Sequence, residues 1–187
     1  MALHLGLTGT PGTGKKSIAP LVASRLRLRA CSLNALAESA QAISGDDVDV
    51  RALRRKLNFP KRARCLPYGH LLPYVLERDE TEMVVVLRCD PVVLARRLRE
   101  RGYPEAKVIE NVEAEFIGVV SADSLAAFGR DKVAEYDTTR DSPVDAAAAV
   151  SGIFRGSVST MPVDWVPHYD APAKLRGLLA PGARRSP

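Results

Sequence analysis

The sequence predicts an α/β domain in which a mostly parallel β-sheet is flanked by helices, and three observations support this fold class. Apolar strand-like segments alternate with helical segments along the chain. A glycine-rich turn at residues 9–14 stands between a short apolar segment and a helical one. The run Met83 to Arg88 (MVVVLR) is apolar and β-branched at successive positions, as in strands buried on both faces.

The first part of the chain predicts two strands and three helices. Leu3 to Thr8 (LHLGLT) is short and largely apolar, which favours a buried strand. Apolar residues at helical spacing predict a helix from Lys15 to about Leu28. Weaker patterns then predict a strand at Ala30 to Leu33, a helix from Asn34 through Ile43, and a helical stretch at Val48 to Leu57.

Helices and strands continue to alternate after the MVVVLR strand. Asp90 and Pro91 start a helix that ends at Gly102, and Pro104 suits the first position of the next helix. In that next helix one apolar stripe is expected, formed by Ile109, Val112, Phe116, Val119 and Val120, while Glu105, Glu110, Asn111 and Glu115 are expected to point elsewhere. The last two elements are a strand at Lys132 to Tyr136 and a helix from Pro143 to about Phe154.

Composition narrows the class of protein. The 187 residues suit one domain, and 46% hydrophobic with 26% charged residues excludes disordered and collagen-like classes. No apolar run approaches the roughly 20 residues of a membrane span, and the N-terminus lacks signal-peptide features, so we expect a cytoplasmic protein that binds no membrane. The net charge of +5 suits phosphate-bearing ligands. Cys31, Cys65 and Cys89 are widely spaced, which argues against a disulfide framework or a zinc site.

The residues Gly9 to Lys15 (GTPGTGK) match the phosphate-binding pattern G-x-x-x-x-G-K, called the P-loop, and lie between a predicted strand and a predicted helix. Glycines allow consecutive backbone N–H groups to surround an anion, and the helix N-terminus adds its positive dipole end. Lys15 supplies a mobile positive charge for the outer phosphates. The sequence therefore predicts a nucleotide-binding protein.

One position departs from this pattern. The residue after the P-loop lysine is normally Ser or Thr, whose hydroxyl binds Mg²⁺, but here it is Lys16, with Ser17 following. Ser17 can still meet a phosphate through its hydroxyl and backbone N–H, the Lys16 ammonium can replace part of the metal's charge, or Lys16 can point to solvent. The departure weakens the expectation of Mg²⁺ binding.

Several further segments resemble the archaeal and nuclear type of adenylate kinase. They are Val84 to Pro91 (VVVLRCDP), Arg101 to Tyr103 with Lys107, Glu110 to Glu115 (ENVEAE), and Tyr136 to Thr139 (YDTT). The resemblance implies a P-loop kinase core at residues 1–155, with an NMP-binding region at about residues 32–53 and a short LID at about residues 100–110. Residues 156–187 would form a C-terminal tail whose order the composition leaves open.

The resemblance also implies which residues contact the nucleotide: Gly12, Gly14, Lys15, Lys16, Ser17 and Arg101. Of these, Lys15 and Arg101 would be catalytic. A guanidinium on a segment that can close is suited to stabilise charge on a transferring phosphoryl group. The alternative for Arg101 is a solvated arginine at a helix end, and Arg97 can equally belong to a wet basic helix face.

A second departure concerns the end of the family's third strand, where an Asp or Glu and a nearby His serve magnesium and water. If Leu71, Leu72 and Pro73 anchor the comparison, the acidic position holds Cys65 and the histidine position holds Pro67. His70 is then the nearest imidazole. Together with Lys16, this substitution weakens the expectation of a bound Mg²⁺ further.

The leading hypothesis is an enzyme that moves the γ-phosphoryl group of ATP to AMP or another nucleoside monophosphate, with ATPase activity as a side reaction. Two rivals remain. The resemblance also implies a factor for small ribosomal subunit maturation that uses ATP to act on a ribosomal protein and rRNA. The third hypothesis is a degenerate kinase that binds nucleotide with little turnover.

Overall fold

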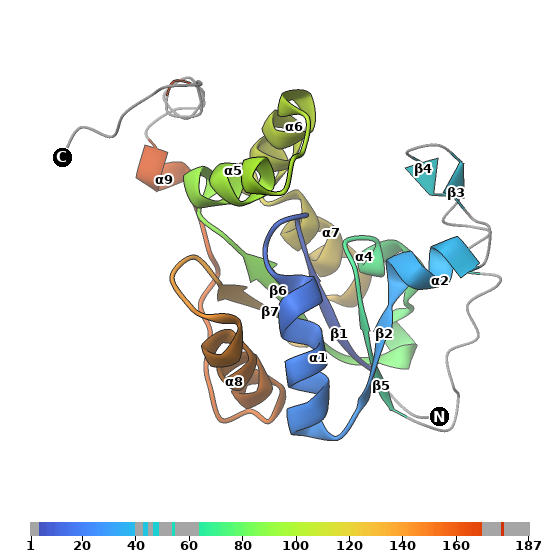
Figure 1. Cartoon of the computed structure of the whole chain (residues 1–187). Coiled ribbons are helices and arrows are strands. Elements are labelled where there is room, and N and C mark those ends of the chain that lie inside the picture. The colour runs from blue at the N-terminus through green and yellow to red at the C-terminus, as the bar shows by residue number, and fades with distance from the viewer. Residues whose placement is uncertain are drawn as a thin grey trace.

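The structure is a computed structural model that describes residues 4–39, 43–44, 47–48, 54, 64–169 and 177. Its centre is a five-stranded sheet in the order β2-β5-β1-β6-β7, and all of these strands pair in parallel (Figure 1). The strands are β1 (His4–Gly9), β2 (Arg29–Ser32), β5 (Cys65–Tyr68), β6 (Thr81–Arg88) and β7 (Val133–Asp137). The strand order reverses between β1 and β6, and open α/β sheets bind ligands beyond the carboxyl ends of strands at such a point.

Helices cover both faces of the sheet. On one face α1 (Lys15–Leu26) packs against α8 (Pro143–Phe154), and the opposite face carries α2 (Leu33–Ser39), α4 (Leu72–Val75) and α7 (Val119–Phe128) (Figure 1). Beyond the carboxyl end of β6 lie α5 (Pro91–Glu100), α6 (Glu105–Phe116) and α9 (Val166–Tyr169). The α/β architecture predicted from the sequence is therefore confirmed.

Three apolar clusters hold these layers together. The first lies between the sheet and α1 with α8, and it includes Leu7, Val22, Val85, Leu87 and Val150. The second lies on the opposite face and includes Leu33, Leu72, Val84 and Phe128. The third joins α5, α6 and α9 through Leu94, Leu98, Val112, Phe116, Trp165 and Tyr169. Because β6 is buried on both faces, its unbroken apolar run serves the first two clusters at once.

Two helix starts are fixed by side-chain caps. The Asp90 carboxylate accepts hydrogen bonds from the backbone N–H groups of Val92 and Val93, which fixes the start of α5. The Ser142 hydroxyl accepts one from the N–H of Asp145 at the start of α8. In both helices a proline occupies the first turn, where its missing N–H has no helical partner to lose.

The weaker predictions need correction at several boundaries. Helix α1 ends at Leu26, two residues early, because Arg27 takes a left-handed conformation with φ 55°. Helix α2 is described over Leu33–Ser39, and Ile43, predicted as the last residue of this helix, instead lies in a strand. The residue pairs Ile43–Ser44 and Asp47–Val48 form the short antiparallel strands β3 and β4, so Val48 does not begin a helix. Most of the predicted helical stretch from Val48 to Leu57 lies outside the described residues.

The single helix predicted after Pro104 is wrong, because the chain forms two helices, α6 and α7. They are separated at Gly118, whose φ of +71° is left-handed. The predicted apolar stripe is interrupted there, and Ile117 is left 67% exposed. Glu115, expected to point away from the core, is instead only 1% exposed.

Part of the C-terminal tail packs on the domain. Trp165 and Tyr169 are buried against α5 and α6, and the two aromatic rings of Tyr169 and Phe116 meet edge to face.

Among the described helices, none has the length and apolar character to cross a lipid bilayer.

Candidate functional site

The P-loop connects β1 to α1 at the carboxyl end of the sheet. Gly14 precedes the helix with φ +100°, and Gly12 has φ +97°, so both use a backbone conformation that other residues rarely adopt. A Cβ on Gly12 would lie 2.5 Å from Leu94 Cδ1. The loop therefore rests directly on α5, and glycine is required at that contact for space as well as for conformation.

Lys15 is folded back onto the loop that carries it. Its ammonium donates hydrogen bonds to the backbone carbonyls of Gly9 and, at 2.9 Å, of Thr10. Loss of hydration lowers the pKa of Lys15 to about 7, the nearby Glu115 carboxylate opposes this shift, and the Arg101 guanidinium adds to it. A phosphate group placed in the loop would favour the charged form of Lys15.

A second set of contacts ties the P-loop to the loop that follows β7. The Thr138 hydroxyl lies 3.0 Å from the carbonyl oxygen of Thr13. Arg97 donates hydrogen bonds to the backbone carbonyls of Thr138, at 2.8 Å, and of Thr139. Arg97 is therefore a structural clamp between α5 and this loop, whereas its neighbour Arg96 is exposed to solvent.

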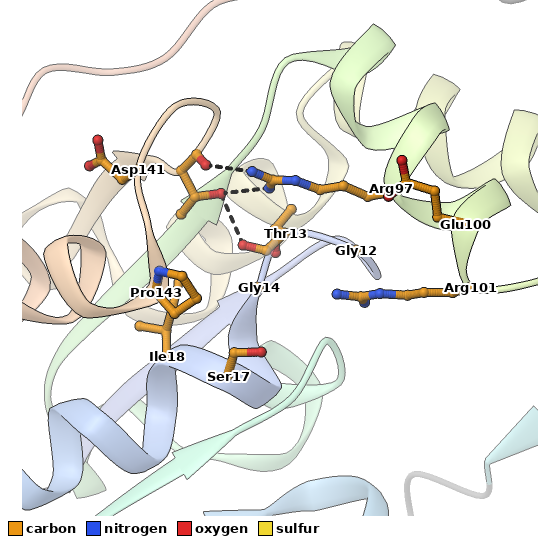
Figure 2. A pocket seen from close by; sticks show the side chains of 11 residues that line it. Gly12, Thr13, Gly14, Ser17, Ile18, Arg97, Glu100, Arg101, Asp141 and Pro143 are labelled. Carbon is orange, nitrogen blue, oxygen red and sulfur yellow. Dashed lines mark hydrogen bonds between the residues drawn. The ribbon is translucent and has the colours of Figure 1, made fainter.

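Two cavities meet at the P-loop. The first has a volume of about 270 Å³ and is lined by Thr13, Ser17, Ile18, Arg97, Thr138 and Asp141 (Figure 2). The second has a volume of about 510 Å³ and is lined by Lys15, Lys16, Asn34, Glu38, Tyr68, His70 and Tyr103. Gly12, Gly14 and Arg101 line both cavities.

Arg101 occupies the junction between these cavities. It follows the last residue of α5, and its side chain extends beside Gly12 toward the P-loop (Figure 2). The structure thus brings the predicted site residues Gly12, Gly14, Lys15 and Arg101 together. Ser17 lines the first cavity and Lys16 the second, and both are exposed.

The placement of Cys65 at the metal-related position is wrong. Cys65 begins β5, and its backbone N–H and thiol face His4 at the start of β1, at the opposite end of the sheet from the P-loop. The residues that follow the end of β5 are Gly69 and His70, and the Gly69 carbonyl accepts a hydrogen bond from Thr8. The position nearest the P-loop is therefore shared by Tyr68, which ends the strand, and His70.

The described residues do not form a protein-held magnesium site. Among them, no group of three or more His, Cys, Asp or Glu side chains is placed to hold a metal ion. The end of β5 carries no carboxylate, and Lys16 brings a positive charge to the loop. The protein therefore offers few oxygen ligands of its own to Mg²⁺, which usually binds through one or two carboxylates together with substrate phosphates and water.

The sequence reasoning missed a buried ionic cluster behind the P-loop, formed by Arg88, Glu115, Glu135 and Trp165. Arg88 Nε donates to Glu115 Oε1 at 2.8 Å, and Arg88 Nη1 donates to Glu135 Oε2 at 3.1 Å. A usable signal was present, because Glu115 follows Val108 and Val112 at helical spacing and so falls on their buried face.

Comparisons with known proteins identify relatives of this chain. Residues 5–118 match a family model described as "AAA domain". A protein of Archaeoglobus fulgidus named "Putative adenylate kinase" is 37% identical over 160 residues, which cover 81% of this chain and 82% of that protein. A protein of the same name from Natronomonas pharaonis is 35% identical over 159 residues, 82% of this chain and 91% of its own length.

Solved structures support the fold. Shikimate kinase from Acinetobacter baumannii superimposes with a TM-score of 0.61 at 13% identity, covering 83% of this chain and 94% of that one. A gluconokinase from Sinorhizobium meliloti gives a TM-score of 0.55 at 18% identity, with 83% and 93% covered. At such identities the likeness concerns the fold alone.

Proposed function

This chain belongs to the family of P-loop kinases represented by the archaeal adenylate kinases, and on that premise we propose that it transfers the γ-phosphoryl group of ATP to AMP or a similar nucleoside monophosphate. The observation that carries the proposal is the position of Arg101 where two cavities meet at the P-loop. Phosphoryl transfer requires donor and acceptor in line on either side of the moving group, with positive charge beside it.

The donor nucleotide is assigned to the first cavity. Its base would lie beside Thr138 and Pro143, on the loop that Arg97 holds, and its phosphates would extend toward Gly12 and Gly14. The P-loop N–H groups would hold the β-phosphate, since they surround the N-terminus of α1. Lys15 would leave its two carbonyl partners and pair with the outer phosphates.

The acceptor is assigned to the second, larger cavity, next to the proposed NMP-binding region. Asn34 and Glu38 present an amide and a carboxylate that suit the hydrogen-bonding edge of a base. Burial lowers the pKa of His70, and the positive charge of Lys15 lowers it further. Both effects favour the neutral imidazole of His70, which can accept a hydrogen bond from a protonated acceptor phosphate or a water molecule.

Catalysis is proposed to rest on charge and position, with no covalent intermediate. Lys15 and Arg101 would neutralise the oxygens of the transferring group. Arg101 lies in the proposed LID, residues 100–110, where the φ of Gly102 is +74° and the side chains of Arg99 and Glu105 pair across the turn. Closure of this segment over the phosphates would exclude water and so favour transfer over hydrolysis.

One observation favours a second candidate function, a nucleotide-responsive protein with little turnover. The end of β5 lacks a carboxylate and Lys16 replaces the usual hydroxyl residue of the P-loop, so the protein supplies few oxygen ligands for a metal. Since metal ions neutralise much of the charge in phosphoryl transfer, this composition slows chemistry more than it weakens binding.

A coupled assay for AMP-dependent ADP formation separates the two candidates. The wild-type protein should form ADP from ATP much faster when AMP is present than when it is absent, and Lys15→Ala should reduce the AMP-dependent rate to background. ADP binding without AMP-dependent turnover, at any Mg²⁺ concentration, would contradict the kinase proposal and support the second candidate.

A further inference from the structure

Glu115 connects the P-loop to the C-terminal segment through a buried network. Its carboxylate accepts hydrogen bonds from four donors: the Thr10 hydroxyl at 2.5 Å, Arg88 Nε at 2.8 Å, the Cys89 N–H at 3.0 Å and Trp165 Nε1 at 3.2 Å. These donors come from the P-loop, the end of β6 and the segment before α9. One side chain therefore links three parts of the chain that are distant in sequence.

Burying the Glu115 carboxylate costs free energy of folding, so its position needs an explanation other than stability. The side chain is only 1% exposed, and its ion-pair partner Arg88 is 3% exposed. A buried ion pair often contributes no more to folding than apolar residues of similar size would. Stability alone therefore gives a weak reason for a carboxylate at this place, whereas a fixed negative charge behind a phosphate-binding loop has a direct chemical use.

The two carboxylate oxygens divide the network between the P-loop and its support. Oε2 receives the Thr10 hydroxyl, and the Thr10 carbonyl in turn accepts a hydrogen bond from the Lys15 ammonium. Oε1 receives the donors from Arg88, Cys89 and Trp165. The carboxylate cannot rotate without losing one of these sets of hydrogen bonds. Arg88, Cys89 and Trp165 therefore fix its orientation, and the carboxylate in turn fixes the position of the Thr10 hydroxyl.

The C-terminal segment completes the support on the side away from the P-loop. The Val163 carbonyl accepts a hydrogen bond from Arg88 at 2.9 Å, and the Val163 N–H donates one to Glu135 at 2.7 Å. The Tyr169 hydroxyl donates to Asp90, the residue that caps α5. Trp165 and Tyr169 are both buried, so this segment shields Glu115 from water.

We propose that Glu115 is a positioning residue that holds Thr10 and the P-loop backbone in the arrangement that binds nucleotide phosphates and places a negative charge behind Lys15, and that Trp165 of the C-terminal segment holds Glu115 in turn. The inference rests on the proposed nucleotide site. It assigns to part of the C-terminal segment a role in phosphate binding, although this segment lies outside the P-loop and the cavity walls.

Among the described residues, the charged or titratable groups that act on Lys15 are Glu115 from α6, Arg101 after α5 and His70 after β5. Of these, only Glu115 carries a negative charge that favours the ammonium form. Removing that charge should make Lys15 lose its proton at a lower pH, and ADP should then bind with proton uptake at a lower pH as well.

The test is calorimetric titration of the full chain with ADP from pH 6 to 9, in buffers of different ionisation enthalpy, which reports proton uptake on binding. Glu115→Gln should weaken ADP binding at pH 7 at least tenfold and move the onset of proton uptake to lower pH. Glu115→Asp, which retains the charge, should restore the onset toward that of wild type. The matched control Glu113→Gln removes a partly exposed carboxylate from the same helix, outside the proposed LID, and should change neither quantity.

Two further variants keep the proposal falsifiable if Glu115→Gln does not fold. Thr10→Val and Trp165→Phe each remove one donor to Glu115 and keep most of the side-chain volume. Each should weaken ADP binding several-fold, with Thr10→Ser restoring it. Affinity unchanged in both variants, or a Glu115→Gln protein that binds ADP weakly with an unmoved proton-uptake profile, would overturn the proposal. Because ADP binding is measured, absence of phosphoryl transfer would contradict the proposed function alone.

Discussion

Replacing Gly12 with alanine tests the contact between the P-loop and α5. The added Cβ would lie 2.5 Å from Leu94 Cδ1 and 3.1 Å from Leu98 Cδ2, and both leucines are fully buried. A left-handed φ costs a residue with a Cβ about 1–2 kcal/mol. Overpacking in a filled core costs about 1–3 kcal/mol more. We expect a total cost of about 2–5 kcal/mol, divided between the stability of the fold and the binding-competent shape of the loop.

Gly156 provides the matched control, because its φ is also left-handed at +70° while no atom lies within 4 Å of its added Cβ. Gly156→Ala should therefore incur only the conformational cost. The assay is urea unfolding of each variant together with calorimetric titration of ADP. The summed losses for Gly12→Ala should exceed those for Gly156→Ala by about 1–3 kcal/mol, the overpacking cost.

Leu94→Ala gives an independent check on the same contact. In the Gly12→Ala background this truncation should cost less than in the wild type, because it also relieves the clash. Equal losses for the two glycine variants, together with a purely additive Gly12→Ala and Leu94→Ala pair, would refute the claim that the P-loop rests on α5.

Three other outcomes follow from the site. Lys15→Ala should abolish most of the rise in melting temperature that ADP causes in the wild type, as measured by thermal unfolding. Arg101→Ala should lower turnover by about 10² or more while ADP affinity stays nearly unchanged, since its contact is made mainly in the transition state; equal losses in both would make it a ground-state anchor. Because the pKa of Lys15 is near 7 in the free protein and phosphate raises it, ADP affinity should fall as pH rises above 7, by up to about tenfold per unit. The Lys15→Ala protein should lack this pH dependence.

The lowered pKa of Lys15 also makes the free energy of unfolding depend on pH. The unfolded chain binds a proton at Lys15 up to its ordinary pKa of 10.5, whereas the folded chain loses that proton near pH 7. The unfolded state therefore binds more protons between these values, and the contribution of Lys15 to the free energy of unfolding increases as pH rises from 7 to about 10. Below pH 7 the cost of burying the charge is fully present.

The P-loop and the β6 strand could be predicted from the sequence, because both depend on residues that are neighbours in the chain. The P-loop was predictable because its glycine spacing, the apolar strand before it and the helix after it all occur within a short segment. The β6 strand was predictable because a strand buried on both faces has an unbroken run of apolar, mostly β-branched residues.

Features that depend on distant partners were not predictable from local patterns. At the break between α6 and α7 the Glu115 carbonyl accepts a hydrogen bond from Arg88 of β6, a partner that the helical pattern alone does not reveal. Cys65 was misplaced because an anchor in the following residues does not determine where a strand ends relative to the P-loop. The role of Trp165 depends on a partner 50 residues away.

The most direct test of the central claim follows the labelled γ-phosphoryl group of ATP in the presence of AMP. The account predicts that the label appears in ADP, and that Arg101→Ala slows its appearance without preventing ADP from binding. Label recovered only as inorganic phosphate, at a rate that AMP does not change, would contradict transfer between the two cavities.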